Sequence, residues 1–263
     1  MGIESVAIKD FKINYLHFGN AQKPKLVLMP GLSIQSVLNS AAAIEKQYAL
    51  LAENFDMYLF DRRENVQMGY SIEDMASDTL AAIDALNISK INIAGVSQGG
   101  MIAQVMAIKR PNLINAMALC STSAEVNPKD EGILNWINLA KQKDAQSLLD
   151  SFFKQVYTSQ FYETHKRAVK VLARYIKDEE LERFIILATP ILGFNVKEDI
   201  KKLNIPTFVC GSKKDNVVPF WCIEELITLL NAKSWILEDS SHALYDESPL
   251  FIPKLLEFFQ QNN

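Results

Sequence analysis

The first residues of the chain alternate between hydrophobic and polar side chains. The alternation runs through SVAIKDFKINYLHFG, on both sides of Lys9-Asp10. A period of two residues is typical of a half-buried strand, so this stretch predicts a β-hairpin. Mostly apolar runs follow at residues 25–30 (KLVLMP), 56–61 (DMYLFD), 91–95 (INIAG) and 114–120 (INAMALC). Such runs indicate strands that are buried on both faces of a sheet.

Stretches with helical spacing of their apolar residues separate these runs. They cover residues 36–54, 72–86 and 99–111. Ser71 precedes the second stretch and Asp74 lies three residues later, which is close to a capping box and marks the start of a helix. Strand and helix thus alternate with short connections up to Cys120. This alternation predicts a parallel sheet with helices on both of its faces.

The alternation stops after Cys120 and resumes about eighty residues later. Residues 123–202 contain only helical patterns, and the strand pattern returns at PTFVCG and KSWILE, with helices in between and at the end. We therefore expect an α/β core made of residues 1–122 and 203–263, interrupted by a helical insertion at 123–202. The central sheet should be mostly parallel, with about eight strands flanked by helices.

Composition and charge exclude several classes of protein. The formal net charge is −4 and basic residues do not cluster, which argues against a nucleic-acid surface. No apolar stretch is long enough to cross a bilayer and the N-terminus lacks a signal core, so we expect a cytoplasmic protein without membrane insertion. The spacing of Cys120, Cys210 and Cys222 fits neither a zinc site nor a redox pair. We expect buried thiols, no metal and no cofactor.

A serine between two glycines follows the strand pattern INIAG. In IAGVSQGGMIAQ, Gly95 and Gly99 flank Ser97 at a distance of two residues, just before a helical stretch. A sharp strand-to-helix turn exposes a serine hydroxyl but crowds the backbone on either side, so those two positions must be glycine. The pattern predicts that Ser97 is a nucleophile, in contrast to an ordinary loop serine.

A serine nucleophile needs a histidine as general base. The chain has three histidines. His17 lies in the opening hairpin, where surface or edge packing is expected, and His165 lies between charged residues of the helical insertion. His242 alone follows a late strand, KSWILE, on a loop. Because the functional groups of a parallel sheet gather at the carboxyl ends of its strands, His242 is the predicted base.

The base needs a carboxylate to orient it, and the hydrolytic intermediate needs two backbone N–H groups. Asp215 follows the strand PTFVCG, whereas Glu238 and Asp239 are close to His242 along the chain. We favour Asp215 over these two because it leaves the carboxyl end of a different strand. The N–H groups of Gln98, directly after the nucleophile, and of Leu32, in the loop PGLSIQ, are the predicted oxyanion donors.

Four stretches together resemble the α/β-hydrolase superfamily: PGL in the first loop, GVSQGG at the serine, GSKKDNVVP at the acid and SHALYDESP at the histidine. The resemblance covers nearly the whole chain. It implies an α/β-hydrolase fold, Ser97, Asp215 and His242 as a catalytic triad, and Leu32 and Gln98 as oxyanion donors. It also implies that the insertion at 123–202 is a cap over the active site.

Two stretches depart from the common pattern of this superfamily. Pro30-Gly31 replaces a frequent His-Gly, so the first loop must be held in another way. The stretch DRRENVQMGYS keeps an aspartate and arginine but lacks the usual glycines. For Arg62 and Arg63, a structural or solvated role is favoured over binding of an acidic substrate.

The sequence therefore predicts a serine hydrolase that acts on a small carboxylic ester, thioester or lactone. A ligand-binding or regulatory protein on the same fold, an acyltransferase and a carbon–carbon bond hydrolase remain alternatives. The expected partner is a small-molecule substrate, and the oligomeric state stays open. Five aromatic residues of the insertion either line a pocket or pack the cap on the sheet, with packing favoured: Trp136, Phe152, Phe153, Tyr157 and Phe184.

Overall fold

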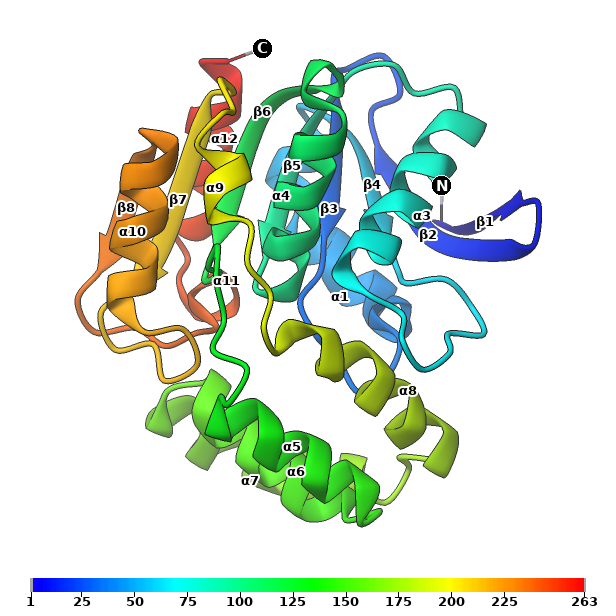
Figure 1. The fold of residues 1–263 in the computed structure, drawn as a ribbon, viewed down its shortest axis with the longest axis vertical. Coiled ribbons are helices and arrows are strands. Elements are labelled where there is room, and N and C mark those ends of the chain that lie inside the picture. The colour runs from blue at the N-terminus through cyan, green and yellow to red at the C-terminus, as the bar shows by residue number, and fades with distance from the viewer. Residues whose placement is uncertain (1, 263) are drawn as a thin grey trace.

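The computed structural model describes residues 2–262 and contains one twisted sheet of eight strands (Figure 1). In spatial order the strands are β1 (Gly2–Ile8), β2 (Phe11–Gly19), β4 (Asp56–Phe60), β3 (Lys25–Met29), β5 (Ile91–Val96), β6 (Ile114–Cys120), β7 (Thr207–Ser212) and β8 (Lys233–Leu237). The strands from β4 to β8 are parallel, and β2 runs antiparallel to both β1 and β4. The predicted hairpin and mostly parallel sheet are confirmed.

Helices cover both faces of the sheet, because successive strand residues point to opposite sides. On one face Val27 and Ile93 pack with α3 (Ile72–Ala85), α4 (Gln98–Lys109) and α10 (Phe220–Leu230). On the other face Leu26 and Leu28 pack with α1 (Ala41–Gln47), α2 (Ala49–Ala52) and α12 (Phe251–Gln260). Figure 1 shows α4 and α10 in front of the sheet and α12 behind it.

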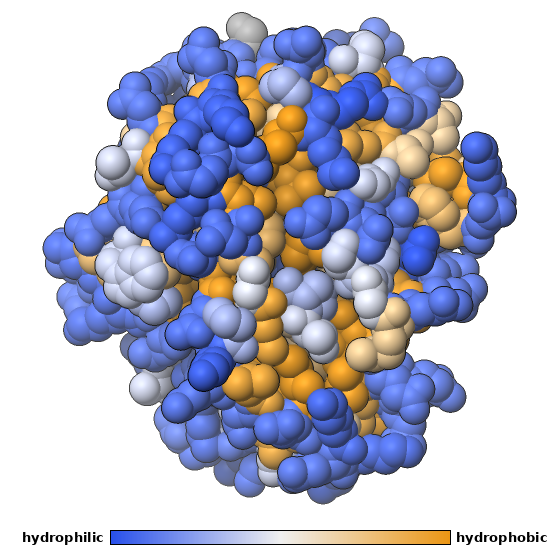
Figure 2. Space-filling model, viewed as in Figure 1, coloured by the Kyte–Doolittle hydropathy of each residue, from blue (hydrophilic) through white to orange (hydrophobic). Residues whose placement is uncertain are grey.

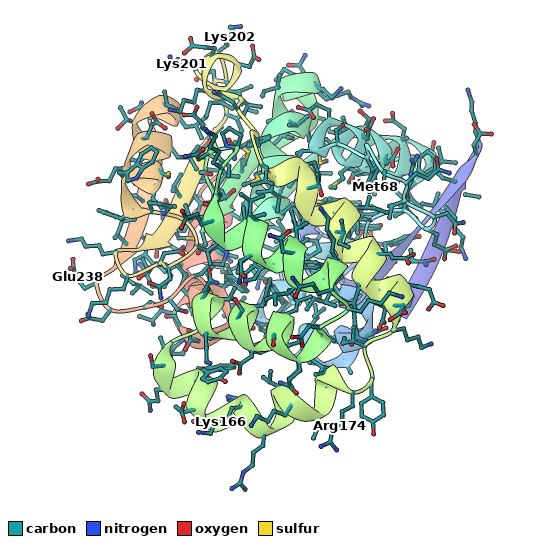
Figure 3. The ribbon with its side chains drawn as sticks, turned by 60° about the horizontal axis from the view of Figure 1, so that its bottom comes forward. Met68, Lys166, Arg174, Lys201, Lys202 and Glu238 are labelled. Carbon is teal, nitrogen blue, oxygen red and sulfur yellow. The ribbon has the colours of Figure 1, made fainter. Side chains whose placement is uncertain are left out.

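The helical patterns of residues 123–202 form α5 (Glu131–Lys141), α6 (Ala145–Val156), α7 (Ser159–Ala173), α8 (Asp178–Ala188) and the short α9 (Lys197–Ile200). Helices α5 to α8 gather at the end of the molecule where the parallel strands finish (Figure 1). Lys166 of α7 and Arg174, directly after that helix, point away from the rest of the molecule (Figure 3). The space between these helices and the strand ends is therefore where a site of this fold is expected.

The local predictions differ from the structure at two places. The single helix expected over residues 36–54 is broken into a 3-10 turn at Val37–Ser40 followed by α1 and α2. The Ser36 hydroxyl caps the backbone N–H of Leu38, and such local side-chain bonds compete with a regular helix. The short helix α11 (Leu244–Glu247), directly after His242, was not expected. The capping box of Ser71 and Asp74 is present at the start of α3.

Candidate active site

Ser97 occupies the sharp turn between β5 and α4. Its backbone angles are φ 51° and ψ −122°, in a region that residues other than glycine rarely adopt. The Ser97 N–H donates to the Cys120 carbonyl at 2.9 Å, and the Ser97 carbonyl accepts from the Thr122 hydroxyl at 2.8 Å. These bonds fix the strained conformation, which leaves the side chain free to project from the end of the sheet.

The glycines around Ser97 are required by close backbone contacts. A Cβ atom on Gly95 would lie 2.5 Å from the Gly99 carbonyl oxygen, and one on Gly99 would lie 2.0 Å from the Met29 carbonyl oxygen. Sequence reasoning assigned this crowding to both positions. It missed Gly100, where a Cβ atom would lie 2.5 Å from the Thr122 side chain. Three glycines therefore let α4 begin directly against the strands.

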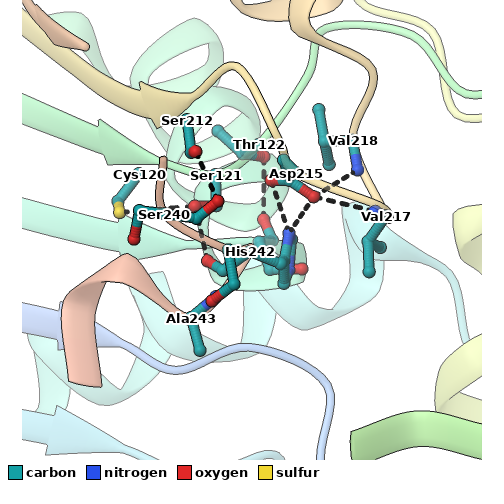
Figure 4. A network of polar contacts seen from close by, with 12 residues as sticks. Cys120, Ser121, Thr122, Ser212, Asp215, Val217, Val218, Ser240, His242 and Ala243 are labelled. Atoms are coloured by element: carbon teal, nitrogen blue, oxygen red, sulfur yellow. Dashed lines mark hydrogen bonds and ion pairs between the residues drawn. The ribbon is translucent and has the colours of Figure 1, made fainter. Parts of the chain in front are cut away.

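His242 and Asp215 form a buried pair at the ends of β8 and β7 (Figure 4). His242 Nδ1 lies 2.9 and 3.1 Å from the two carboxylate oxygens of Asp215. Asp215 Oδ1 also accepts the N–H groups of Val217 and Val218, each at 2.8 Å, and the His242 carbonyl accepts from the Ser121 hydroxyl at 2.7 Å. The ring is thus held with its Nε2 atom directed away from Asp215.

The competing candidates lie elsewhere. Glu238 and Asp239 form ion pairs with Lys213 and Lys214, and Glu238 projects from the outside of the molecule (Figure 3). His17 lies in the hairpin, where Nε2 is 2.8 Å from Asp56, and His165 is exposed on α7. Their surroundings agree with the positions that the sequence suggested for these two histidines.

A cavity of about 450 Å³ brings Ser97 and His242 together beneath α5 and α6. Within residues 2–262 no hydrogen bond joins the Ser97 hydroxyl to His242, and both side chains line this shared space. Catalytic hydrogen bonds of a free enzyme are often long and shorten once a substrate is bound. The surface nearby is apolar, since Figure 2 shows hydrophobic side chains where α5 and α8 meet the rest of the molecule.

The two predicted oxyanion donors flank Ser97. Gly31 lies so close that a Cβ atom on it would be 3.4 Å from the Ser97 Cβ atom, which places the next residue, Leu32, on the wall of the cavity. Gln98 follows Ser97 as the first residue of α4. In the described chain the backbone N–H groups of Leu32 and Gln98 donate to no protein acceptor. Both groups are therefore available to an incoming oxygen atom.

Arg62 and Arg63 do not line the cavity. Arg62 is buried, and its Nη2 atom donates to the Pro30 carbonyl at 2.7 Å and to the Gln98 side-chain oxygen at 3.0 Å. Burial lowers the pKa of Arg62 to about 10. The Arg63 guanidinium stacks on the ring of Tyr70, near the other end of the stretch DRRENVQMGYS. These contacts describe the structural role that the sequence favoured, and Arg62 is one of the residues that hold the first loop.

The five aromatic residues that the sequence analysis singled out in residues 123–202 divide between those that line a cavity and those that pack in the core. Trp136 and Phe152 line the cavity and contact each other with ring centroids 4.8 Å apart. Phe153 and Tyr157 line a second cavity of about 480 Å³, which borders the first at Leu32, Phe152 and Val156. Phe184 is fully buried. Core packing, the role favoured from helical spacing, holds for Phe184 and also for Trp136, although Trp136 borders the cavity as well. Phe152, Phe153 and Tyr157 pack against the same core with one side and line a hollow with the other, which helical spacing does not reveal.

Glu247 is a residue whose role sequence reasoning missed. It accepts hydrogen bonds from the Ser241 hydroxyl and from the backbone and hydroxyl of Thr158, in the turn between α6 and α7. The Ala243 N–H also donates to the Val156 carbonyl at 2.9 Å. The loop that carries His242 is therefore fastened to residues 123–202. The only signal in the sequence was the position of Glu247 in the stretch SHALYDESP.

Asp246 lies at the edge of the second cavity, and its carboxyl allows a test of how folding stability depends on pH. The residue is exposed at the surface, but neighbouring groups desolvate its carboxyl and raise the pKa, although Tyr157 and Gln47 donate hydrogen bonds to it. Ionisation therefore costs folded-state stability as the pH rises above the pKa of an unfolded aspartate, about 3.9. Asp246→Asn should raise the Tm relative to the parent protein more at pH 7 than at pH 4, as measured by thermal melts. An equal difference at both pH values would contradict this assignment.

No helix in residues 2–262 is long and apolar enough to span a membrane. Within the same residues, no group of three or more His, Cys, Asp or Glu side chains is arranged to hold a metal ion. The three cysteines are free and buried. The cytoplasmic location and the lack of a nucleic-acid partner stay predictions from the sequence.

Comparisons with known proteins agree with this architecture. A family model described as alpha/beta hydrolase fold matches residues 43–249. The chain is 20% identical over 219 residues to 3-oxoadipate enol-lactonase 2 of Acinetobacter baylyi, covering 81% of this chain and 80% of that protein. Two crystal structures share its fold. One is an enol-lactonase from Burkholderia xenovorans LB400, with 19% identity and a TM-score of 0.84 over 98% of this chain and 100% of that one. The other is the α/β-hydrolase MGS-M2 from a Medee basin deep-sea metagenome library, with 22% identity and a TM-score of 0.88 over 99% of this chain and 98% of that one. The chain belongs to the α/β-hydrolase family.

Proposed function

We propose that this protein is a serine hydrolase that cleaves a small carboxylic ester, thioester or lactone through an acyl-enzyme on Ser97. The observation that carries the proposal is the buried His242–Asp215 pair, which faces the same cavity as a serine on a strained strand-to-helix turn. The relatives named as enol-lactonases support a hydrolase of this kind. In this proposal residues 1–122 and 203–263 form the core and residues 123–202 form a cap.

The reaction would proceed in two steps. His242 Nε2 takes the proton of the Ser97 hydroxyl, and the serine oxygen attacks the substrate carbonyl carbon. The carbonyl oxygen becomes an oxyanion that the N–H groups of Leu32 and Gln98 stabilise. The imidazolium then protonates the leaving group, and Asp215 stabilises that imidazolium through Nδ1. Water, activated by His242, attacks the acyl-enzyme in the second step and releases the acid.

The lining of the cavity favours an uncharged substrate. None of the described residues that line it is a lysine or an arginine. Its two carboxylates are already engaged, because Glu125 pairs with Lys197 and Asp130 accepts the N–H of Ile133 at the start of α5. A substrate carboxylate would lose its hydration here without gaining a cationic partner, which is costly.

A panel of matched esters tests this substrate class. We expect kcat/KM for 4-nitrophenyl butyrate to exceed that for 4-nitrophenyl hemisuccinate, which carries an acyl carboxylate, by at least about tenfold because the unpaired charge is desolvated. Spontaneous hydrolysis of each ester is measured in parallel and subtracted. Equal rates, or a preference for the anionic ester, would argue against a neutral substrate but leave the nucleophile intact.

Labelling with a fluorophosphonate tests the nucleophile directly. The active protein should gain one phosphonyl group per chain, and peptide mass spectrometry should place that group on Ser97. Labelling at another residue, or none in a folded sample, would remove the support for an acyl-enzyme. Tight ligand binding without ester turnover would instead favour the ligand-binding alternative.

A further inference from the structure

We infer that Arg62 is a positioning residue that fixes both backbone donors of the oxyanion hole. The inference rests on the proposed function and adds a residue that the triad does not contain. Pro30 lies two residues before Leu32 in the first loop, and Gln98 carries the second donor itself. One nitrogen of Arg62, Nη2, bonds to both segments, at 2.7 Å to the Pro30 carbonyl and at 3.0 Å to Gln98 Oε1.

The two contacts join the first loop to the start of α4 just beyond the point where β3 and β5 pair, at Met29 and Gly95. Pro30 has no N–H group with which to anchor the loop, and this chain lacks a histidine beside Gly31. The Gln98 side chain is fully buried and its amide nitrogen donates to the Leu187 carbonyl, so Arg62 and Leu187 together fix the side chain that extends from the first turn of α4. The guanidinium therefore adds hydrogen bonds between the loop and the helix start, beside the close backbone contact of Gly99 with Met29 and Pro30.

The position of Arg62 is specific to an arginine. Nη2 carries two protons in the plane of the guanidinium, so that it donates to two acceptors in fixed directions. A lysine ammonium is a single point charge on a flexible stem. It is more strongly hydrated than a guanidinium, so its burial costs more free energy. The negative charge of Asp61 favours the charged form of Arg62, and Asp61 Oδ1 also accepts the Arg62 backbone N–H at 2.7 Å.

The same network reaches the helices over the site. Asp61 accepts hydrogen bonds from Arg183 of α8 at 3.2 Å and from Ser36 in the first loop at 2.6 Å. Leu187, which fixes the Gln98 amide, also belongs to α8. The position of α8 therefore influences the distance between the N–H groups of Leu32 and Gln98.

The test compares Arg62→Lys and Arg62→Met with the matched variants Arg63→Lys and Arg63→Met. Arg63 is adjacent in sequence but pairs with Asp78 and stacks on Tyr70, away from the first loop. For 4-nitrophenyl acetate we expect kcat to fall by about 10- to 100-fold in Arg62→Met and less in Arg62→Lys, with KM changed far less, because a misplaced donor weakens the transition state more than the bound substrate. The rate of phosphonylation by a fluorophosphonate should fall in parallel.

The Arg63 variants should keep kcat and the phosphonylation rate within about twofold of the parent, whatever their melting temperature. If Arg62→Met does not fold, the kinetics of Arg62→Lys alone test the positioning role, because this variant keeps a buried cation. Parent-like kcat and phosphonylation in folded Arg62→Lys and any folded Arg62→Met would overturn the positioning role. So would equal losses in the Arg62 and Arg63 variants. A parent protein that neither labels nor turns over would instead refute the proposed function, which separates the two failures.

Discussion

Replacing Ser97 by alanine is expected to lower kcat on a 4-nitrophenyl ester by about 10⁵- to 10⁶-fold. The variant loses the oxygen that forms the acyl-enzyme, and His242 then has no hydroxyl to deprotonate. Oxyanion donors and the cavity remain, so a small residual rate above the uncatalysed reaction should persist. Steady-state kinetics with a matched melting curve measure the effect.

Ser123→Ala is the control for this experiment. Ser123 is buried and lines the same cavity, but it does not have the positive φ angle of Ser97. The control should keep most of the activity, which shows that loss of a hydroxyl from the cavity is not itself sufficient. Activity in folded Ser97→Ala close to that of the parent would end the proposal that Ser97 is the nucleophile.

Replacing Asp215 by asparagine is expected to lower kcat by about 10⁴-fold. Asparagine keeps the size of the side chain and can still accept the N–H groups of Val217 and Val218. It loses the negative charge that stabilises the His242 imidazolium, and its amide group favours the wrong tautomer of the ring. The melting temperature should change far less than the rate, since the local fold is retained.

Glu238→Gln and Asp239→Asn serve as matched controls for the acid. Each removes one carboxylate near His242 along the chain, and in each case the carboxylate pairs with a surface lysine. Exposed ion pairs contribute little to stability, so both controls should behave like the parent protein in rate and melting temperature. A large loss in either control, with Asp215→Asn unaffected, would reverse the assignment of the acid.

The fold was predictable because its signals are local. Runs such as residues 91–95 and 114–120 are apolar on both faces, and a buried parallel strand requires this pattern. The positions of Ser97, Asp215 and His242 could be predicted for a related reason. Parallel strands end at one edge of the sheet, so residues far apart in sequence but each just after a strand meet there.

The role of Arg62 could not be predicted, because it depends on three segments that meet only after folding. Nothing near residue 62 in the sequence indicates that its guanidinium reaches Pro30 and Gln98. The same holds for the fastening of Glu247 to Thr158 and for the second cavity. Helical spacing gives the face of a helix that is apolar, but it does not say whether that face meets a side chain or an empty space.

The strained backbone at Ser97 also limits how this position can change by mutation. A residue at φ 51° costs on the order of 1–3 kcal/mol unless it is glycine, out of a total stability of about 5–15 kcal/mol for a typical domain. A glycine at position 97 would therefore relieve this backbone strain, whereas positions 95, 99 and 100 require glycine because a Cβ atom there would be too close to neighbouring atoms. The hydroxyl group at position 97 is therefore presented at a cost in folding stability, and Ser97→Gly would exchange the nucleophile for a more relaxed turn.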